Sequence, residues 1–140
     1  MNLKKLCLIS ALSVGLITTS SITGFANSSY TSTLNMSVNS SVTGAYRDYK
    51  GSRHAIGITI TSRDYHSDKD TNNCYIELQK QRGLTYDGQG SKLKNMPEIK
   101  KTYKESWSGQ NDGKFRYYFT NFRVSGGDGF TSNKVEMSSN

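Results

Sequence analysis

Apolar and polar residues alternate over several short stretches of this 140-residue chain. The even positions between residues 32 and 46 carry the apolar side chains of the first stretch: Leu34, Met36, Val38 and Val42. The odd positions there hold almost only Thr, Ser and Asn. A period of two residues is typical of a β-strand with one buried face. The stretch therefore predicts one long strand, or two strands joined by a bend near Asn39-Ser40.

Two further stretches repeat this pattern. Residues 54–62 place isoleucines at positions 56, 58 and 60, and residues 74–78 place Cys74, Ile76 and Leu78 at even positions. We predict that these two stretches form a hairpin. Because both apolar sets must share one face, even residues have to lie opposite even residues. Ile60 opposite Ile76, with Ile58 opposite Leu78, satisfies this condition.

The second half of the chain predicts more strands. Alternating residues at 103–107 and 115–119, separated by the turn-rich segment 108–113, suggest a second hairpin with cross-strand aromatic pairs and a buried Trp107. Residues 131–137 suggest a last strand with Val135 and Met137 inward. Residues 83–95 have the weakest pattern, and residues 96–101 are compatible with one helical turn that begins at Pro97.

The composition supports an all-β fold. The chain has one proline, 13 glycines and nine tyrosines, and tyrosine favours strands. We expect six to seven strands in a small antiparallel β-sandwich, with a small β-barrel as the alternative. Residues 27–140 have the length of a single domain. Cys74 is the single cysteine after residue 26, so core packing rather than an internal disulfide must stabilise this domain.

The first 26 residues have the layout of a secretory signal peptide. Lys4 and Lys5 precede an apolar run over residues 6–17, and Gly24-Phe25-Ala26 supplies small residues for cleavage. The run is shorter than the ~20 residues that span a bilayer. We therefore expect cleavage after Ala26 and a secreted, extracellular protein.

The charge of the chain favours anionic partners outside the cell. The formal net charge is +7, and it would be lower by two without Lys4 and Lys5. Cell-wall polymers, acidic glycans and anionic lipid headgroups are the expected partners, and we expect no nucleic acid partner. Solubility alone is the competing explanation of the charge.

Candidate reactive and metal-binding groups are few. Cys74 shares the parity of Ile76, which predicts a buried thiol, with an intermolecular disulfide as the alternative. His54 and His66 are the two histidines. The segment Asp68–Asn72 alternates oxygen ligands as a calcium loop does, but it lacks the turn glycine and the final glutamate of an EF-hand. We expect no metal site and no cofactor.

The sequence also lacks the patterns of common hydrolases. No Gly-x-Ser-x-Gly motif is present, and no spacing singles out a pair of carboxylates. Glu105 is unusual because it shares the parity of Tyr103 and Trp107, which places a carboxylate on an otherwise aromatic face. We therefore expect a protein without enzymatic activity.

Outward tyrosines suggest a binding function. The candidate ligand-binding residues are Tyr75, Gln79, Arg116 and Tyr118. Aromatic rings beside amides and charged groups suit sugars, whose C–H faces stack on the rings while their hydroxyls form hydrogen bonds. Ordinary strand propensity also explains such tyrosines. We predict binding to a cell-surface glycan or the cell wall. The alternative is a bacteriocin-like or membrane-active toxin that uses the amphipathic stretch 32–46.

Overall fold

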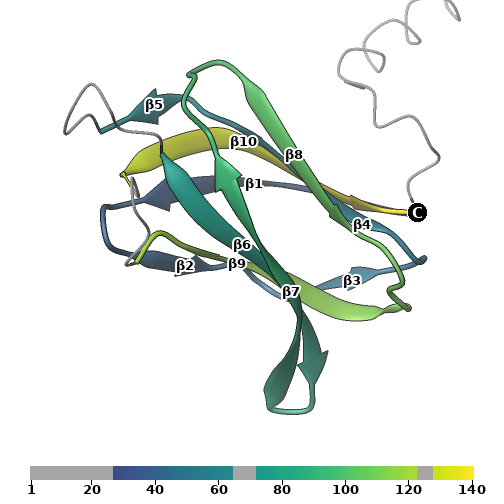
Figure 1. Ribbon diagram of the computed structural model, residues 1–140. Coiled ribbons are helices and arrows are strands. Elements are labelled where there is room, and N and C mark those ends of the chain that lie inside the picture. The colour runs from purple at the N-terminus through teal and green to yellow at the C-terminus, as the bar shows by residue number, and fades with distance from the viewer. Residues whose placement is uncertain (1–26, 65–71, 123–127) are drawn as a thin grey trace, which may run out of the picture.

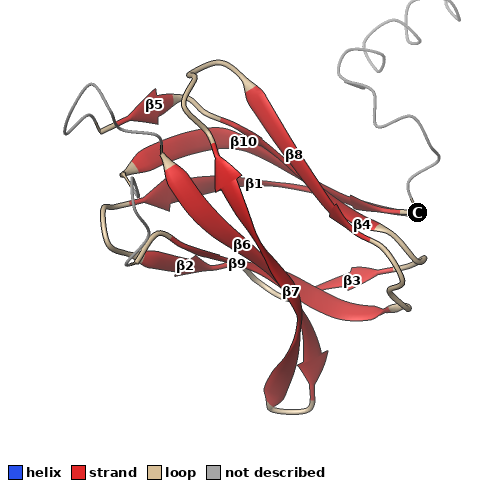
Figure 2. Ribbon diagram, in the orientation of Figure 1, coloured by secondary structure: helices blue, strands red, loops and turns tan. Residues whose placement is uncertain are grey.

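The computed structural model describes residues 27–64, 72–122 and 128–140, and these residues form strands and no helix (Figure 2). The strands are β1 (Ser28–Met36), β2 (Ser41–Thr43), β3 (Arg47–Tyr49), β4 (His54–Thr59), β5 (Ser62–Arg63), β6 (Asn73–Arg82), β7 (Thr85–Asn95), β8 (Thr102–Trp107), β9 (Gly113–Thr120) and β10 (Phe130–Ser139). The described part of the chain has no helix of the length and apolar character needed to cross a membrane. The predicted signal peptide, residues 1–26, lies outside the described ranges.

The strands form two antiparallel sheets that pack face to face (Figure 1). The first sheet has the order β1-β10-β4-β8, and β5 extends it by pairing with β10. The second sheet has the order β2-β9-β6-β7, and β3 also pairs with β9. The sheets stay separate and do not close into a barrel. The predicted β-sandwich is therefore confirmed, with short strands that raise the number above the six or seven expected.

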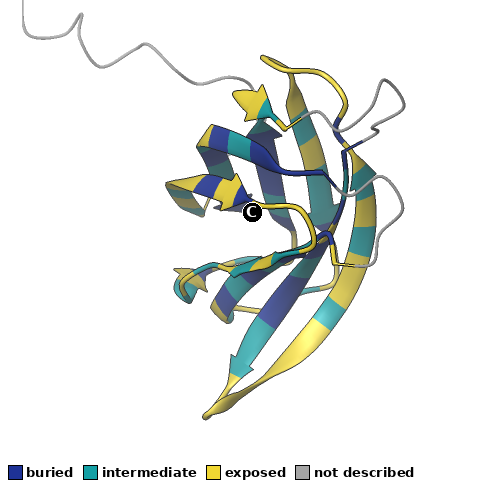
Figure 3. Cartoon of the chain, turned by 90° about the vertical axis from the view of Figure 1, so that its left-hand side faces the viewer, coloured by how far each residue is buried: buried dark blue, intermediate teal, exposed yellow. Residues whose placement is uncertain are grey.

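The core lies between the sheets, where their buried sides face each other (Figure 3). Both sheets supply alternate residues to it, as the period of two predicts. Its largest fully buried apolar side chains are Tyr49, Tyr117, Phe115, Phe130, Met36, Ile56, Ile58, Ile60, Ile76, Leu78 and Met96. Trp107, Val135 and Met137 also belong to this core, as predicted.

The predicted bend after the first strand is present. β1 ends at Met36 and β2 begins at Ser41, and between them Asn39 has a φ of 52°. Asparagine tolerates this left-handed conformation better than most residues. Since β1 and β2 belong to different sheets, the bend carries the chain across the sandwich.

Both predicted hairpins are wrong. β4 pairs with β10 and β8, whereas β6 pairs with β7 and β9 in the other sheet. The pairing of Ile60 with Ile76 therefore does not occur, and the two apolar sets meet across the core instead. Similarly, β8 and β9 lie in different sheets. Parity identifies the buried face of a strand. It does not tell whether two strands pair within one sheet or lie in opposite sheets, because both arrangements bury the same residues.

The weakly patterned segment 83–95 forms the long strand β7. It pairs with β6 in a hairpin whose tip extends past the rest of the sandwich (Figure 1). Leu84 at this tip is fully exposed, so the segment has little core to face and alternates poorly. The predicted helical turn over residues 96–101 is also wrong. Met96 is buried there, and its carbonyl accepts a hydrogen bond from the Asn72 amide at 3.0 Å.

Candidate functional site

The four predicted site residues lie together on the outward side of the second sheet. On neighbouring strands β6 and β9, Gln79 is opposite Arg116, and Glu77 is opposite Tyr118. Tyr75 lies two residues before Glu77 in β6 and therefore on the same side of this strand, as the alternation of a strand requires. We call this surface, comprising Tyr75, Glu77, Gln79, Arg116, Tyr118 and Thr120, the outer face.

A chain of hydrogen bonds fixes the polar groups of the outer face. The Arg116 Nε donates to Oε1 of Gln79 at 2.8 Å, and Nε2 of Gln79 donates to Oε2 of Glu77 at 2.7 Å. Gln79 is 2% exposed. Its amide is therefore occupied at both ends and covered, so the prediction of direct ligand contact does not fit this residue. Gln79 instead positions the Arg116 guanidinium.

Two tyrosines that the sequence did not single out complete the cluster around Arg116. The guanidinium carbon of Arg116 lies 4.5 Å from the ring centre of Tyr46 and 5.2 Å from that of Tyr86. Cation–π contacts of this kind stabilise an exposed site by about 0.5–1 kcal/mol each. Tyr46 comes from the segment between β2 and β3, and Tyr86 comes from β7. The β6–β7 register would have revealed Tyr86, but no local pattern marks Tyr46.

A β-bulge in β7 makes room for the Glu77 carboxylate. The register between β6 and β7 shifts between Glu77 and Gln79, and Gly88 lies opposite Gln79. A Cβ atom on Gly88 would stand 2.4 Å from Oε1 of Glu77, which is closer than real contacts allow. Glycine at position 88 leaves room for the observed position of this carboxylate, and any side chain there would displace its Oε1.

Next to Tyr118 the surface is hollowed. This depression has a volume of about 490 Å³ and is lined by Asn39, Ser40, Ser41, Tyr118, Thr120 and Phe122. Phe122 is 54% exposed, so an aromatic side chain borders the depression at the surface. The other lining groups are hydroxyls, an amide and backbone. The depression thus continues the outer face with the same combination of aromatic and hydrogen-bonding groups.

Asn121 holds the walls of the depression in place from below. It is fully buried, its Oδ1 accepts the backbone N–H of Ser40 at 2.7 Å, and its Nδ2 donates to the carbonyls of Ser37 and Asp128 at 2.9 and 2.8 Å. One side chain therefore ties the β1–β2 turn to the segment after β9. Such preorganisation lowers the entropy that binding would otherwise lose.

The thiol of Cys74 is buried, as predicted. Burial raises its pKa to about 12, so the thiol stays protonated and unreactive at neutral pH. His54 is also buried, and its ring stacks on Tyr49 and meets Phe115 edge-on at centroid distances of 5.1 and 4.3 Å. His66 and positions 68–71 of the predicted calcium loop lie outside the described residues.

No model of a known protein family matches the chain, and no curated protein is significantly similar to it. The geometry of the outer face must therefore support any functional conclusion. This face combines exposed aromatic rings, a fixed guanidinium and a hydroxyl-rich depression. That combination suits recognition of a neutral or acidic hydroxylated ligand.

Proposed function

We propose that this protein is an exported, non-enzymatic domain that binds a glycan of the cell surface or cell wall through its outer face. The observation that carries the proposal is the cluster of Tyr46, Tyr86 and Tyr118 around or beside Arg116. The layout of residues 1–26 supports export, and the net charge of the chain, +7 with Lys4 and Lys5 and so 7 − 2 = +5 without them, supports an anionic surface polymer.

The chemistry of each group fits a sugar chain. The C–H faces of pyranose rings stack on tyrosine and phenylalanine, and Tyr75 and Phe122 are 41% and 54% exposed for such contacts. The Nε of Arg116 is bound to Gln79. The terminal N–H groups of the guanidinium would donate hydrogen bonds to a carboxylate or hydroxyl of the glycan. The depression beside Tyr118 would accept the next sugar unit.

Sedimentation with purified peptidoglycan tests the proposal. The Tyr75→Ala/Tyr118→Ala double variant is expected to bind about thirtyfold more weakly, since each ring contact contributes about 1 kcal/mol. Ile99→Ala is the matched control, because Ile99 is 48% exposed but lies between β7 and β8, away from the outer face. Equal binding by the double variant and the control would contradict the proposal.

The toxin alternative depends on the amphipathic stretch 32–46. In the folded domain Leu34 and Met36 of this stretch are buried in the core, so their entry into a bilayer would require the sandwich to open. Glycan binding needs no such change and is therefore preferred. Dye release from anionic vesicles by the folded protein would reverse this preference.

A further inference from the structure

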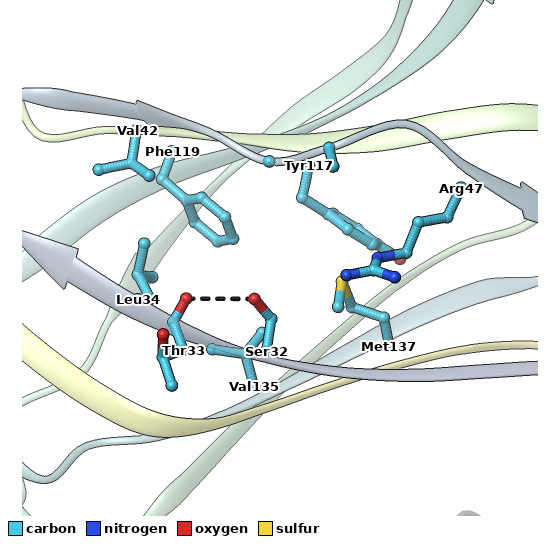
Figure 4. Close-up of a pocket in the computed structure, with 11 residues that line it drawn as sticks. Ser32, Thr33, Leu34, Val42, Arg47, Tyr117, Phe119, Val135 and Met137 are labelled. Carbon is cyan, nitrogen blue, oxygen red and sulfur yellow. Dashed lines mark hydrogen bonds between the residues drawn. The ribbon is translucent and has the colours of Figure 1, made fainter.

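A separate pocket opens on the side of the sandwich where β1 faces β2 and β3 (Figure 4). It has a volume of about 110 Å³ and reaches the core between the sheets. Its lining residues are Ser32, Thr33, Leu34, Val42, Gly44, Ala45, Arg47, Tyr117, Phe119, Val135 and Met137. None of these residues belongs to the outer face, so the pocket is a different site.

The pocket exists because the edge of the second sheet is interrupted. β2 ends at Thr43 and β3 begins at Arg47, and the segment between them includes the small residues Gly44 and Ala45. Gly44 keeps this segment on the sheet by donating its N–H to the Tyr117 carbonyl at 2.9 Å. A Cβ atom on Gly44 would lie 3.1 Å from that carbonyl oxygen. The close approach favours glycine and leaves no large side chain to cover the core.

Apolar side chains line most of the pocket, and its cationic group lies at one end. Leu34, Val42 and Phe119 lie at the other end, near the hydrogen bond from the Ser32 hydroxyl to the Thr33 carbonyl, whereas Arg47 and the phenol of Tyr117 lie beside Met137 (Figure 4). Such a division matches a ligand with an apolar body and one polar group.

The Tyr117 hydroxyl has no hydrogen-bond partner among the described residues, although Tyr117 is only 2% exposed. A buried polar atom without a partner destabilises the protein, and a hydrogen bond to a ligand oxygen would remove this penalty. Burial raises the pKa of this phenol well above 10. The hydroxyl therefore keeps its proton, and because the oxygen itself is buried, a ligand oxygen reaches it only by displacing the side chains that cover it.

Arg47 supplies a positive charge at the same end. Its guanidinium carbon lies 5.0 Å from the ring centre of Tyr30, and no carboxylate within residues 27–64, 72–122 and 128–140 forms an ion pair with it. An anionic group on the ligand would complement this charge.

We propose that this pocket binds a small carboxylic acid with a branched aliphatic body. Its body would fill the apolar end beside Leu34 and Phe119, and its carboxylate would accept a hydrogen bond from Tyr117 and face Arg47. A cavity of about 150 Å³ holds benzene, and this pocket is smaller at about 110 Å³, so a body of about four carbons is the size that the volume suggests. The site is independent of the proposed glycan surface.

Titration followed by two-dimensional NMR tests this inference with 3-methylbutanoate as the probe. Saturable shifts are expected for the methyl groups of Leu34, Val42 and Met137. Acetate has the charge without the body, and 3-methylbutanamide has the body without the charge. Both are expected to bind at least tenfold more weakly, because acetate lacks the apolar groups whose burial favours binding and the amide lacks the charged hydrogen-bond acceptor.

Two variants remove the groups expected to bind the carboxylate, and a third fills the space expected to hold the apolar body of the ligand. Tyr117→Phe and Arg47→Gln are each expected to weaken binding about tenfold, and Val42→Phe is expected to abolish it by filling the pocket. Arg82→Gln, at the exposed tip of the β6–β7 hairpin, is the control and should leave binding unchanged. A thermal melt of each variant establishes that it is folded.

The inference is overturned if 3-methylbutanoate causes no saturable shift in the wild-type protein, which would indicate a pocket filled by water alone. It is also overturned if Tyr117→Phe and Arg47→Gln, both folded, bind the probe as the wild type does. Glycan sedimentation is measured in parallel, so failure of one site is distinguished from failure of the other.

Discussion

The two sides of the sandwich, where edge strands of opposite sheets face each other, are closed by different chemistry. Between β7 and β8, which we call the charged side, Lys94 and Lys92 reach Glu105 with N···O distances of 2.8 and 3.5 Å. Between β1 and the β2–β3 segment, which we call the pocket side, Tyr30 donates a hydrogen bond to the Asp48 carbonyl at 2.5 Å, and the pocket remains.

The two sides differ in the length of the side chains at their edges. On the charged side, the long lysine stems cover the core while their ammonium groups stay near solvent. Lys92 and Lys94 also donate to the carbonyls of Ser106 and Lys104 on β8. On the pocket side, Gly44 and Ala45 have no such reach. Long lysine side chains, together with the Trp107 ring, therefore close one side, and the small residues of the β2–β3 segment leave the other open.

The largest expected effect is at Trp107, which anchors the charged side. Its ring is 4% exposed, and its Nε1 donates to the Gly90 carbonyl at 2.9 Å. Trp107→Ala is expected to lower the free energy of unfolding by about 3–5 kcal/mol, because it removes a large buried ring and leaves a cavity. Urea unfolding measures this change.

Leu93→Ala on β7 is the matched control, because Leu93 is 50% exposed, and it should change the free energy by less than about 0.5 kcal/mol. A loss below about 1 kcal/mol for Trp107→Ala would mean that the ring does not anchor this side.

A smaller effect is expected from the ion pairs of Glu105. Burial raises the pKa of this carboxyl, but the hydrogen bond and charge of Lys94, together with the charge of Lys92, outweigh it and the pKa is lowered. The folded state therefore binds its proton at lower pH than the unfolded chain. The stabilisation is complete above the unfolded pKa of about 4.3 and is lost as the pH falls through the folded value.

Glu105→Gln is thus expected to be about 1 kcal/mol less stable than the wild type at pH 7 and equally stable at about pH 3. Burial lowers the pKa of His54. Because the unfolded imidazole takes up a proton below about pH 6.5, acid also destabilises both proteins through His54. This contribution cancels in the difference between them. A difference that does not change with pH would show that the ion pairs contribute nothing.

The sequence predicted the buried face of each strand better than it predicted which strands pair. Alternation identified the buried isoleucines of β4 and the common outward side of Gln79 and Arg116, because parity is a local property of a strand. It also located the bend at Asn39, where a positive φ suits the residue. Pairing is not local: whether β4 lies beside β6 or across from it depends on the whole topology, and both arrangements bury the same residues.

The same limit applied to the sites. The position of Glu105 on an aromatic face was visible in the sequence, but its explanation required two lysines from the edge strand of the other sheet. The Tyr46 contact with Arg116 depends on the interruption between β2 and β3, which the sequence presented as one continuous alternating stretch. Contacts that cross between elements were therefore the part that could not be predicted.

A last pair of variants contrasts one buried polar atom on each side, and Tyr117→Phe has the smallest expected effect. Trp107→Phe on the charged side removes the donor to Gly90, so the free energy of unfolding should fall by about 1 kcal/mol or more. Tyr117→Phe on the pocket side removes a hydroxyl that has no partner among the described residues, so stability should stay equal or rise by up to about 1 kcal/mol. Thermal and urea unfolding without added ligand measure both. Destabilisation of Tyr117→Phe by more than about 1 kcal/mol would show that the hydroxyl is already satisfied in the free protein, and the reason to expect a ligand oxygen beside it would disappear.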